Sequence, residues 1–123
     1  CIMSSHIHLI IANDNSNLPA IIRDLKSYTA KRIIEMIINN PQESRKEWLL
    51  HSFKYFAKYN KQNSEYQFWQ KTTHPIELFT PAVFDQKVDY IHRNPVEAMQ
   101  VNDEGSFVYS SANPDSPFKV DES

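Results

Sequence analysis

The hydrophobic positions of this chain follow more than one period. An isoleucine-rich apolar run over residues 1–11 predicts a buried strand. Apolar residues then recur every three or four positions over residues 18–37, which predicts an amphipathic helix. The same spacing predicts a second helix over residues 42–60 and a third that begins at Pro81. Between these two helices, the aromatic run over residues 66–72 has strand character.

Cap and turn residues mark the ends of the expected helices. Ser16 or Asn17 is placed to cap the first helix, whose first turn tolerates Pro19. Pro41 ends that helix, because a residue that precedes proline disfavours helical geometry. Thr80 is the expected cap of the third helix.

Two pairs of polar residues on these elements carry candidate chemistry. His6 and His8 are two apart in a strand, so their side chains are expected on one face. Tyr90 and Asn94 are four apart in a helix, so they are expected to project together. Two imidazoles, an amide oxygen and a phenol are the parts of a metal-assisted phosphoryl transfer.

Each of these residues also has a structural explanation. Histidines in a strand are commonly structural, a helix tyrosine usually packs its ring, and Asn94 can end a helix before Pro95. His74 and His92 are further titratable side chains near this region, and either can contact phosphate or carry a proton. Nothing pairs them in sequence, so a structural role is expected and they stay outside the candidate site.

Four segments spread along most of the chain resemble, in order, the signatures of the REP-associated tyrosine transposases of the HUH superfamily. These segments are Met3-Ser4-Ser5-His6-Ile7-His8-Leu9-Ile10, Phe68-Trp69-Gln70, Tyr90-Ile91-His92-Arg93-Asn94-Pro95-Val96-Glu97-Ala98 and Tyr109-Ser110-Ser111-Ala112. Ser4-Ser5 stands where the family usually shows Pro-Asn, so the turn into the histidine strand is expected to differ locally.

The resemblance implies an α+β fold, in which helices pack on an antiparallel sheet, the ferredoxin-like HUH nuclease fold. The histidine strand would be central, and the tyrosine helix would lie beside it. The expected domain is residues 1–112, followed by an acidic tail over residues 113–123. Family members have two strands and a helix before the histidine strand, so the chain is expected to lack the family's N-terminal part.

The resemblance also implies a DNA transposase or endonuclease that cleaves and rejoins single-stranded DNA, including hairpins. His6, His8 and Asn94 become ligands of a divalent metal, and Tyr90 becomes the nucleophile that forms a 5′-phosphotyrosyl link. Because an ordinary tyrosine has a pKa of about 10, its phenol needs such help at neutral pH. Two imidazoles and one amide oxygen suit Mg²⁺ or Mn²⁺ better than zinc.

Two other functions stay open at this point. The chain would be a binding module for single-stranded DNA or hairpins if it lacks part of the catalytic site. It would be a metal-dependent phosphodiesterase if water, and not Tyr90, attacks the phosphate. Related enzymes act as dimers in which each tyrosine helix serves its partner, so a homodimer is a further expectation.

Composition favours one globular domain, because 41% hydrophobic and 23% charged residues are ordinary for a packed core with a solvated surface. No run approaches the roughly 18 apolar residues of a membrane span, so no membrane partner is expected. The lone cysteine, Cys1, cannot form an internal disulfide, which favours the cytoplasm.

The charge is distributed unevenly, although the net charge is only −2. Residues 21–71 hold ten Lys or Arg against five acids, whereas residues 97–123 hold six acids against one lysine. The basic segment favours contact with DNA phosphates, although lysines that merely solvate helix faces explain the charge as well. The expected DNA contacts are Arg23, Lys26, Lys31, Arg32, Lys54, Lys58 and Arg93.

Overall fold

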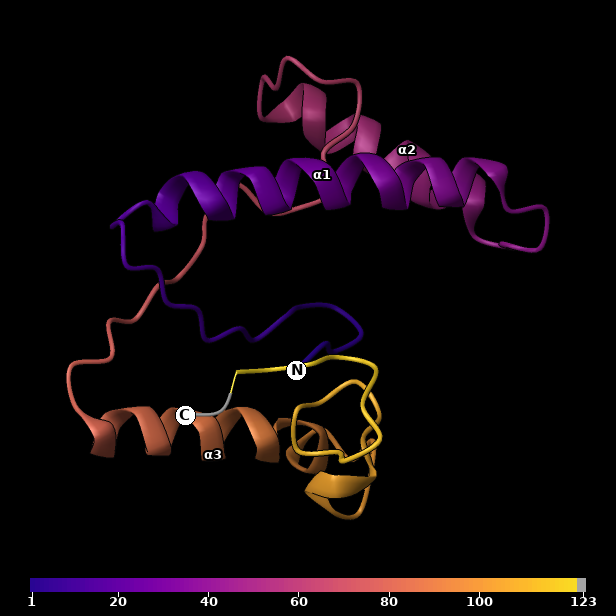
Figure 1. Ribbon diagram of the computed structural model, residues 1–123. Helices are drawn as coiled ribbons and strands as arrows, with labels where there is room; N and C mark the ends of the chain where they lie inside the picture. The colour runs from indigo at the N-terminus through magenta and orange to yellow at the C-terminus, as the bar shows by residue number, and fades with distance from the viewer. Residues whose placement is uncertain (122–123) are drawn as a thin grey trace. The chain divides into compact units, whose positions relative to one another are not determined.

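The computed structural model describes residues 1–121. Its helices are α1 (Leu18–Asn39), α2 (Lys46–Tyr59) and α3 (Pro81–Glu97), followed by a short 3₁₀ turn, η1 (Glu104–Ser106) (Figure 1). The chain forms two compact units. The middle unit is Ala12–Pro75, and the terminal unit combines Cys1–Ile11 with the described residues from Ile76 onward.

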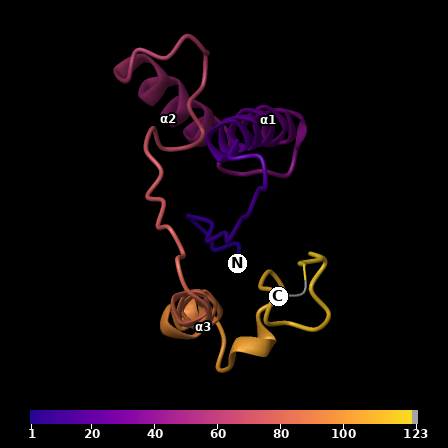
Figure 2. The ribbon, with the colours of Figure 1, turned by 60° about the vertical axis from the view of Figure 1, so that its left-hand side comes forward.

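The middle unit is built on α1 and α2, which lie side by side (Figure 2). The segment after α2 returns across both helices. Its Gln67 N–H donates to the carbonyl of Phe53 on α2 at 2.9 Å, and its Trp69 indole N–H donates to Thr29 Oγ1 on α1 at 2.9 Å. Each bond joins residues that are far apart in the sequence, and together the two bonds hold residues 66–72 against α1 and α2.

The terminal unit joins the two ends of the described chain around α3. Ile91 and Pro95, four apart on α3, form its buried side. The first eight residues make a tight hairpin, and its Ile2 N–H donates to the carbonyl of Tyr109 at 2.9 Å. The next residue, Ser110, is fully buried, and its hydroxyl accepts the N–H of Ala112 at 3.2 Å.

The expected antiparallel sheet with helices packed on it is wrong for residues 1–121, which are mainly helical. Their strand pairing is limited to one isolated antiparallel bridge between Ile2 and Ile7. A strand persists only when a neighbour satisfies its backbone N–H and C=O groups. The apolar run over residues 1–11 folds back on itself for a few residues and finds no further strand to pair with. The run over residues 66–72 pairs with a helix carbonyl and is not a strand.

The helix predictions are confirmed, with small shifts at the ends. The face predicted over residues 18–37 lies within α1, which has its proline in the first turn, and the second helix begins four residues later than expected. Asn17 takes the N-cap position, but its side chain makes no cap bond. Thr80 caps α3 as expected, because its hydroxyl accepts the N–H of Val83 at 3.2 Å.

The expected acidic tail, residues 113–123, is described as far as Asp121, and residues 122–123 lie outside the described part. The single domain over residues 1–112 stays a prediction. Among residues 1–121, no helix is both long enough and apolar enough to cross a membrane.

Removal of the α3 cap should loosen the start of the helix that carries Tyr90 and Asn94. Thr80→Ala deletes the hydroxyl that accepts the Val83 N–H, and loss of such a cap costs about 1 kcal/mol. Amide hydrogen exchange in the first turns of α3 should therefore accelerate about fivefold. Thr73→Ala is the control, because Thr73 is exposed and lies outside the described helices. Equal exchange in both variants would contradict the cap assignment.

Candidate metal and nucleophile site

The N-terminal hairpin brings the two histidines together. Met3 N–H donates to the carbonyl of His6, and His8 N–H donates to the carbonyl of Cys1, both at 2.9 Å. Residues 4–5 form the turn between them. Since side chains two apart share a face of an extended segment, the two rings meet, with Nε2 of His6 3.1 Å from Nε2 of His8. The expected convergence of this pair is confirmed, whereas its role stays a prediction.

Helix α3 presents Tyr90 and Asn94 to the same place. The ring of Tyr90 meets that of His8 edge to face, with centroids 5.5 Å apart and an interplanar angle of 84°. Asn94, one turn later on α3, is near enough to His8 for its side-chain amide to raise the pKa of that ring. Tyr90 is 50% exposed, so part of its side chain remains accessible to a substrate. Four residues from positions 6 to 94 thus gather within the terminal unit.

The segment that begins at Tyr109 holds the hairpin and α3 in this relation. Its first residue accepts the N–H of Ile2 from the hairpin, and Ser111 Oγ lies 2.8 Å from Nε2 of His92 on α3. His92 therefore has a structural partner outside the site, as the sequence suggested. The fourth sequence signature, residues 109–112, therefore connects the N-terminal hairpin to α3, the two elements that carry the candidate site.

Burial and nearby positive charge lower the pKa of His8. Partial burial is the largest cause, the nearby His6 ring lowers the pKa further, the Asn94 amide raises it in part, and the positive N-terminus also lowers it. A neutral imidazole offers a nitrogen lone pair, which a metal requires. On His6, Nδ1 lies 3.0 Å from Ser5 Oγ, and an Nδ1–H donated to that hydroxyl leaves Nε2 free to accept.

The spacing of the two Nε2 atoms fits two neighbouring ligands on one cation. With metal–nitrogen bonds of about 2.1 Å, a separation of 3.1 Å corresponds to an angle of about 95° at the metal. That angle is close to the octahedral value and below the tetrahedral one. Among residues 1–121, no cluster of three His, Cys, Asp or Glu side chains exists, so the amide of Asn94 is the third donor at hand. The donor set therefore fits Mg²⁺ or Mn²⁺ with open positions for water and phosphate.

Lys87 is a site residue that the sequence analysis missed. Its Nζ lies 5.7 Å from the centroid of the Tyr90 ring, which is within the range of a cation–π contact. Lys87 precedes Tyr90 by three positions on α3, and this spacing is the signal that identifies it. The ammonium group favours one ring position and adds positive charge beside the phenol.

The expected DNA-binding residues fall into both units. Six of them belong to the middle unit, and Arg93 alone belongs to the terminal unit. Lys26 donates to the carbonyl of Gln70 at 2.8 Å. Several others form exposed ion pairs, which are weak and exchange readily for phosphate contacts. These pairs are Arg23–Asp24, Arg32–Glu35, Lys54–Glu65 and Arg93–Glu97.

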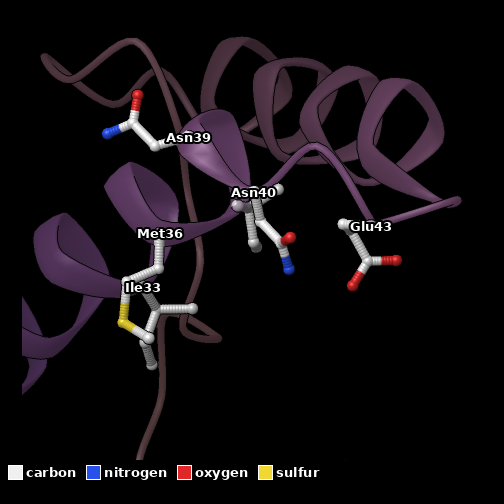
Figure 3. A pocket seen from close by; sticks show the side chains of 6 residues that line it. Ile33, Met36, Asn39, Asn40 and Glu43 are labelled. Atoms are coloured by element: carbon white, nitrogen blue, oxygen red, sulfur yellow. The ribbon is translucent and has the colours of Figure 1, made fainter.

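An open hollow lies at the C-terminal end of α1 in the middle unit (Figure 3). It is lined by Ile33, Met36, Ile37, Asn39, Asn40 and Glu43. None of these residues belongs to the candidate site, and only Glu43 is ionisable.

Comparisons with protein-family models, curated proteins and solved structures find no match for this chain.

The low pKa of His8 makes a prediction for pH titration. Above about pH 6.5 both folded and unfolded chains hold this ring neutral, whereas at lower pH the unfolded chain takes up the proton first. The contribution of His8 to stability is therefore full above about pH 6.5 and is lost as pH falls through its lower folded pKa. His6→Gln removes one of the three causes that lower this pKa, so the pKa of His8 should rise while burial still holds it below 6.5.

Histidine NMR measures this shift directly, since each ring reports its own titration. His74→Gln is the matched control, because His74 is exposed and lies outside the candidate site. An unchanged His8 midpoint in His6→Gln would mean that the two rings do not interact in solution.

Proposed function

We propose that this protein is a single-strand DNA transposase or endonuclease that resembles the REP-associated tyrosine transposases. The observation that carries the proposal is the meeting of His6, His8, Tyr90 and Asn94 from two distant segments of the chain. A purely structural histidine pair would not require an accessible phenol and an amide beside it. The proposal rests on this local geometry and on the sequence signatures, and not on the sheet.

In the proposed reaction, the hydroxyl of Tyr90 attacks a phosphodiester of single-stranded DNA. A new bond forms between the phenolic oxygen and phosphorus, while the bond to the 3′ oxygen breaks. The phenolic proton passes to solvent, which the half-exposed ring allows, and the leaving 3′ oxygen takes up a proton. The phosphodiester energy is kept in the 5′-phosphotyrosyl bond, so the released 3′ hydroxyl can reverse the step and rejoin strands.

The other side chains of the site bind and position. A divalent cation, Mg²⁺ or Mn²⁺, would be held by His6, His8 and Asn94, and when bound it would polarise a non-bridging phosphate oxygen. Lys87 would hold the Tyr90 ring and attract the incoming phosphate. The basic side chains of the middle unit would supply sequence-independent affinity for the strand.

Tyr90→Phe should abolish covalent attachment to DNA while leaving DNA binding intact. The change removes only the attacking oxygen, and the edge contact of the ring with His8 is kept. The test is incubation with 5′-labelled and 3′-labelled hairpin oligonucleotides and Mn²⁺, followed by a denaturing protein gel. Tyr109→Phe is the matched control, because Tyr109 lies in the same unit and is also about half exposed, at 53%.

The outcomes separate the three functions. A labelled protein band that requires both Mn²⁺ and Tyr90 supports the transposase chemistry. Cleavage that persists in Tyr90→Phe without an adduct would replace it with a water-dependent phosphodiesterase. Binding of every hairpin with neither cleavage nor adduct would leave a binding module.

Metal binding should depend on His6, His8 and Asn94 before any DNA is added. His6→Ala and His8→Ala each remove one nitrogen of the 3.1 Å pair. Each should weaken Mn²⁺ binding by more than the 10- to 100-fold that loss of an outer-sphere partner typically costs. Asn94→Ala should have a smaller effect, because an amide oxygen is the weakest of the three ligands. Titration calorimetry with Mn²⁺ measures all three, and an affinity equal to that of His74→Ala would remove the residue concerned from the ligand set.

A further inference from the structure

One side of α2 presents aromatic rings to solvent. Trp48, Tyr55 and Tyr59 lie seven and four positions apart, which places them on one helix face. Their exposed fractions are 66%, 56% and 71%, whereas Ala57 on the opposite side is buried. We name Trp48, Tyr55 and Tyr59 the aromatic face of α2. Exposed aromatic rows of this kind mark interaction surfaces, because they gain little by facing water.

The rings of the aromatic face are arranged as flat platforms. Tyr55 and Tyr59 are nearly parallel, with an interplanar angle of 15° and centroids 6.1 Å apart. Phe56 supports Tyr55 from the side in an edge contact, with centroids 5.3 Å apart. From Trp48 to Tyr59 the face runs roughly 16 Å along the helix, given the rise of about 1.5 Å per residue. That length matches about five nucleotides at the stacked spacing of about 3.4 Å.

Positive charge borders the aromatic face. Lys54 and Lys58 lie along one edge of α2, and Lys61 follows the end of the helix. Lys54 forms an exposed ion pair with Glu65, in which Nζ lies 3.2 Å from Oε1. Lys58 and Lys61 make no ion pair within residues 1–121. Glu47 is the one acidic residue of α2. The face thus combines flat apolar rings with cations along its edge.

This combination selects one kind of occupant. A single strand of nucleic acid offers bases that stack on aromatic rings and phosphates that lysines neutralise. A buried protein interface would instead be depleted in lysine, because ammonium groups are costly to desolvate. We propose that the aromatic face of α2 and its lysines bind single-stranded DNA by base stacking. The ligand class rests on the proposed function, but the surface belongs to the middle unit and none of its rings belongs to the candidate site of the terminal unit.

The first test compares two strands with the same charge. One probe is a fluorescent thymidine oligonucleotide of about 12 nucleotides, and the other is an abasic strand of equal length. Fluorescence anisotropy is read with the full chain in EDTA, so that no cleavage occurs. The thymidine strand should bind at least tenfold more tightly, and it should quench the fluorescence of Trp48. Equal affinity for both strands would overturn stacking and leave only electrostatic attraction.

The second test removes the rings one at a time. Tyr55→Ala and Tyr59→Ala should each weaken thymidine binding about 5- to 150-fold, the range that corresponds to loss of one base–ring stack. Neither change should weaken binding of the abasic strand to the same degree. Tyr28→Ala is the matched control, since Tyr28 is 68% exposed on α1 and lies outside the aromatic face. A Lys58→Ala variant should instead lower the salt dependence, with the slope reduced by about 0.7.

The remaining outcomes are also decisive. Unchanged thymidine affinity in both tyrosine variants would overturn the proposal. A dimer in light scattering that dissociates in Tyr55→Ala, without any change in DNA affinity, would assign the face to a second copy of the chain. Adduct formation tests Tyr90 separately, so stacking can stand while the transposase proposal fails, and the reverse also holds.

Discussion

The candidate site depends on the close approach of two imidazole nitrogens, Nε2 of His6 and Nε2 of His8, which lie 3.1 Å apart. Both rings belong to a hairpin that is held by backbone hydrogen bonds from Met3 to His6 and from His8 to Cys1. Two protonated rings cannot remain at that distance without strong repulsion. The pair must therefore share one proton in a hydrogen bond or share a cation. The lowered pKa of His8 follows from the same contact together with partial burial, and it favours the neutral ring that a metal needs. Backbone bonds of the hairpin keep the two rings on one face whether or not a cation is bound.

A hairpin of eight residues is not stable by itself, so its position depends on the segment that follows η1. The carbonyl of Tyr109 accepts a bond from the hairpin, and the hydroxyl of Ser111 contacts His92 on α3. Ser110, between them, is fully buried. The relation between the histidine pair and Tyr90 is therefore set by three consecutive residues that are not members of the candidate site. Such supporting contacts decide whether a site is positioned well enough for catalysis.

The helices could be predicted from the sequence because their signals are local. The apolar spacing of α1 and the Thr80 cap each depend on neighbours within four residues. The side-chain pairs of the site were equally local, since each pair shares one element. The sheet could not be obtained this way, because an apolar run becomes a strand only if a distant partner satisfies its backbone. Lys87 was overlooked because the four sequence signatures do not include it, although its spacing of three positions from Tyr90 places both side chains on one side of α3. Residues 109–112 connect the hairpin and α3, which are about 90 residues apart in the sequence, and no local pattern predicts such a connection.

The net charge of −2 does not argue against a DNA ligand, because electrostatic attraction acts over short distances. At physiological salt the Debye length is about 8 Å, so a strand on α2 responds mainly to charges within that distance, which include the lysines beside the aromatic face. Lys58 lies in that range of the aromatic face, and it makes no ion pair within the described residues. Flat rings add affinity that salt does not screen, because stacking needs no charge. A surface that combines base stacking with phosphate contacts keeps part of its affinity for single-stranded DNA at ionic strengths where phosphate contacts alone would fail.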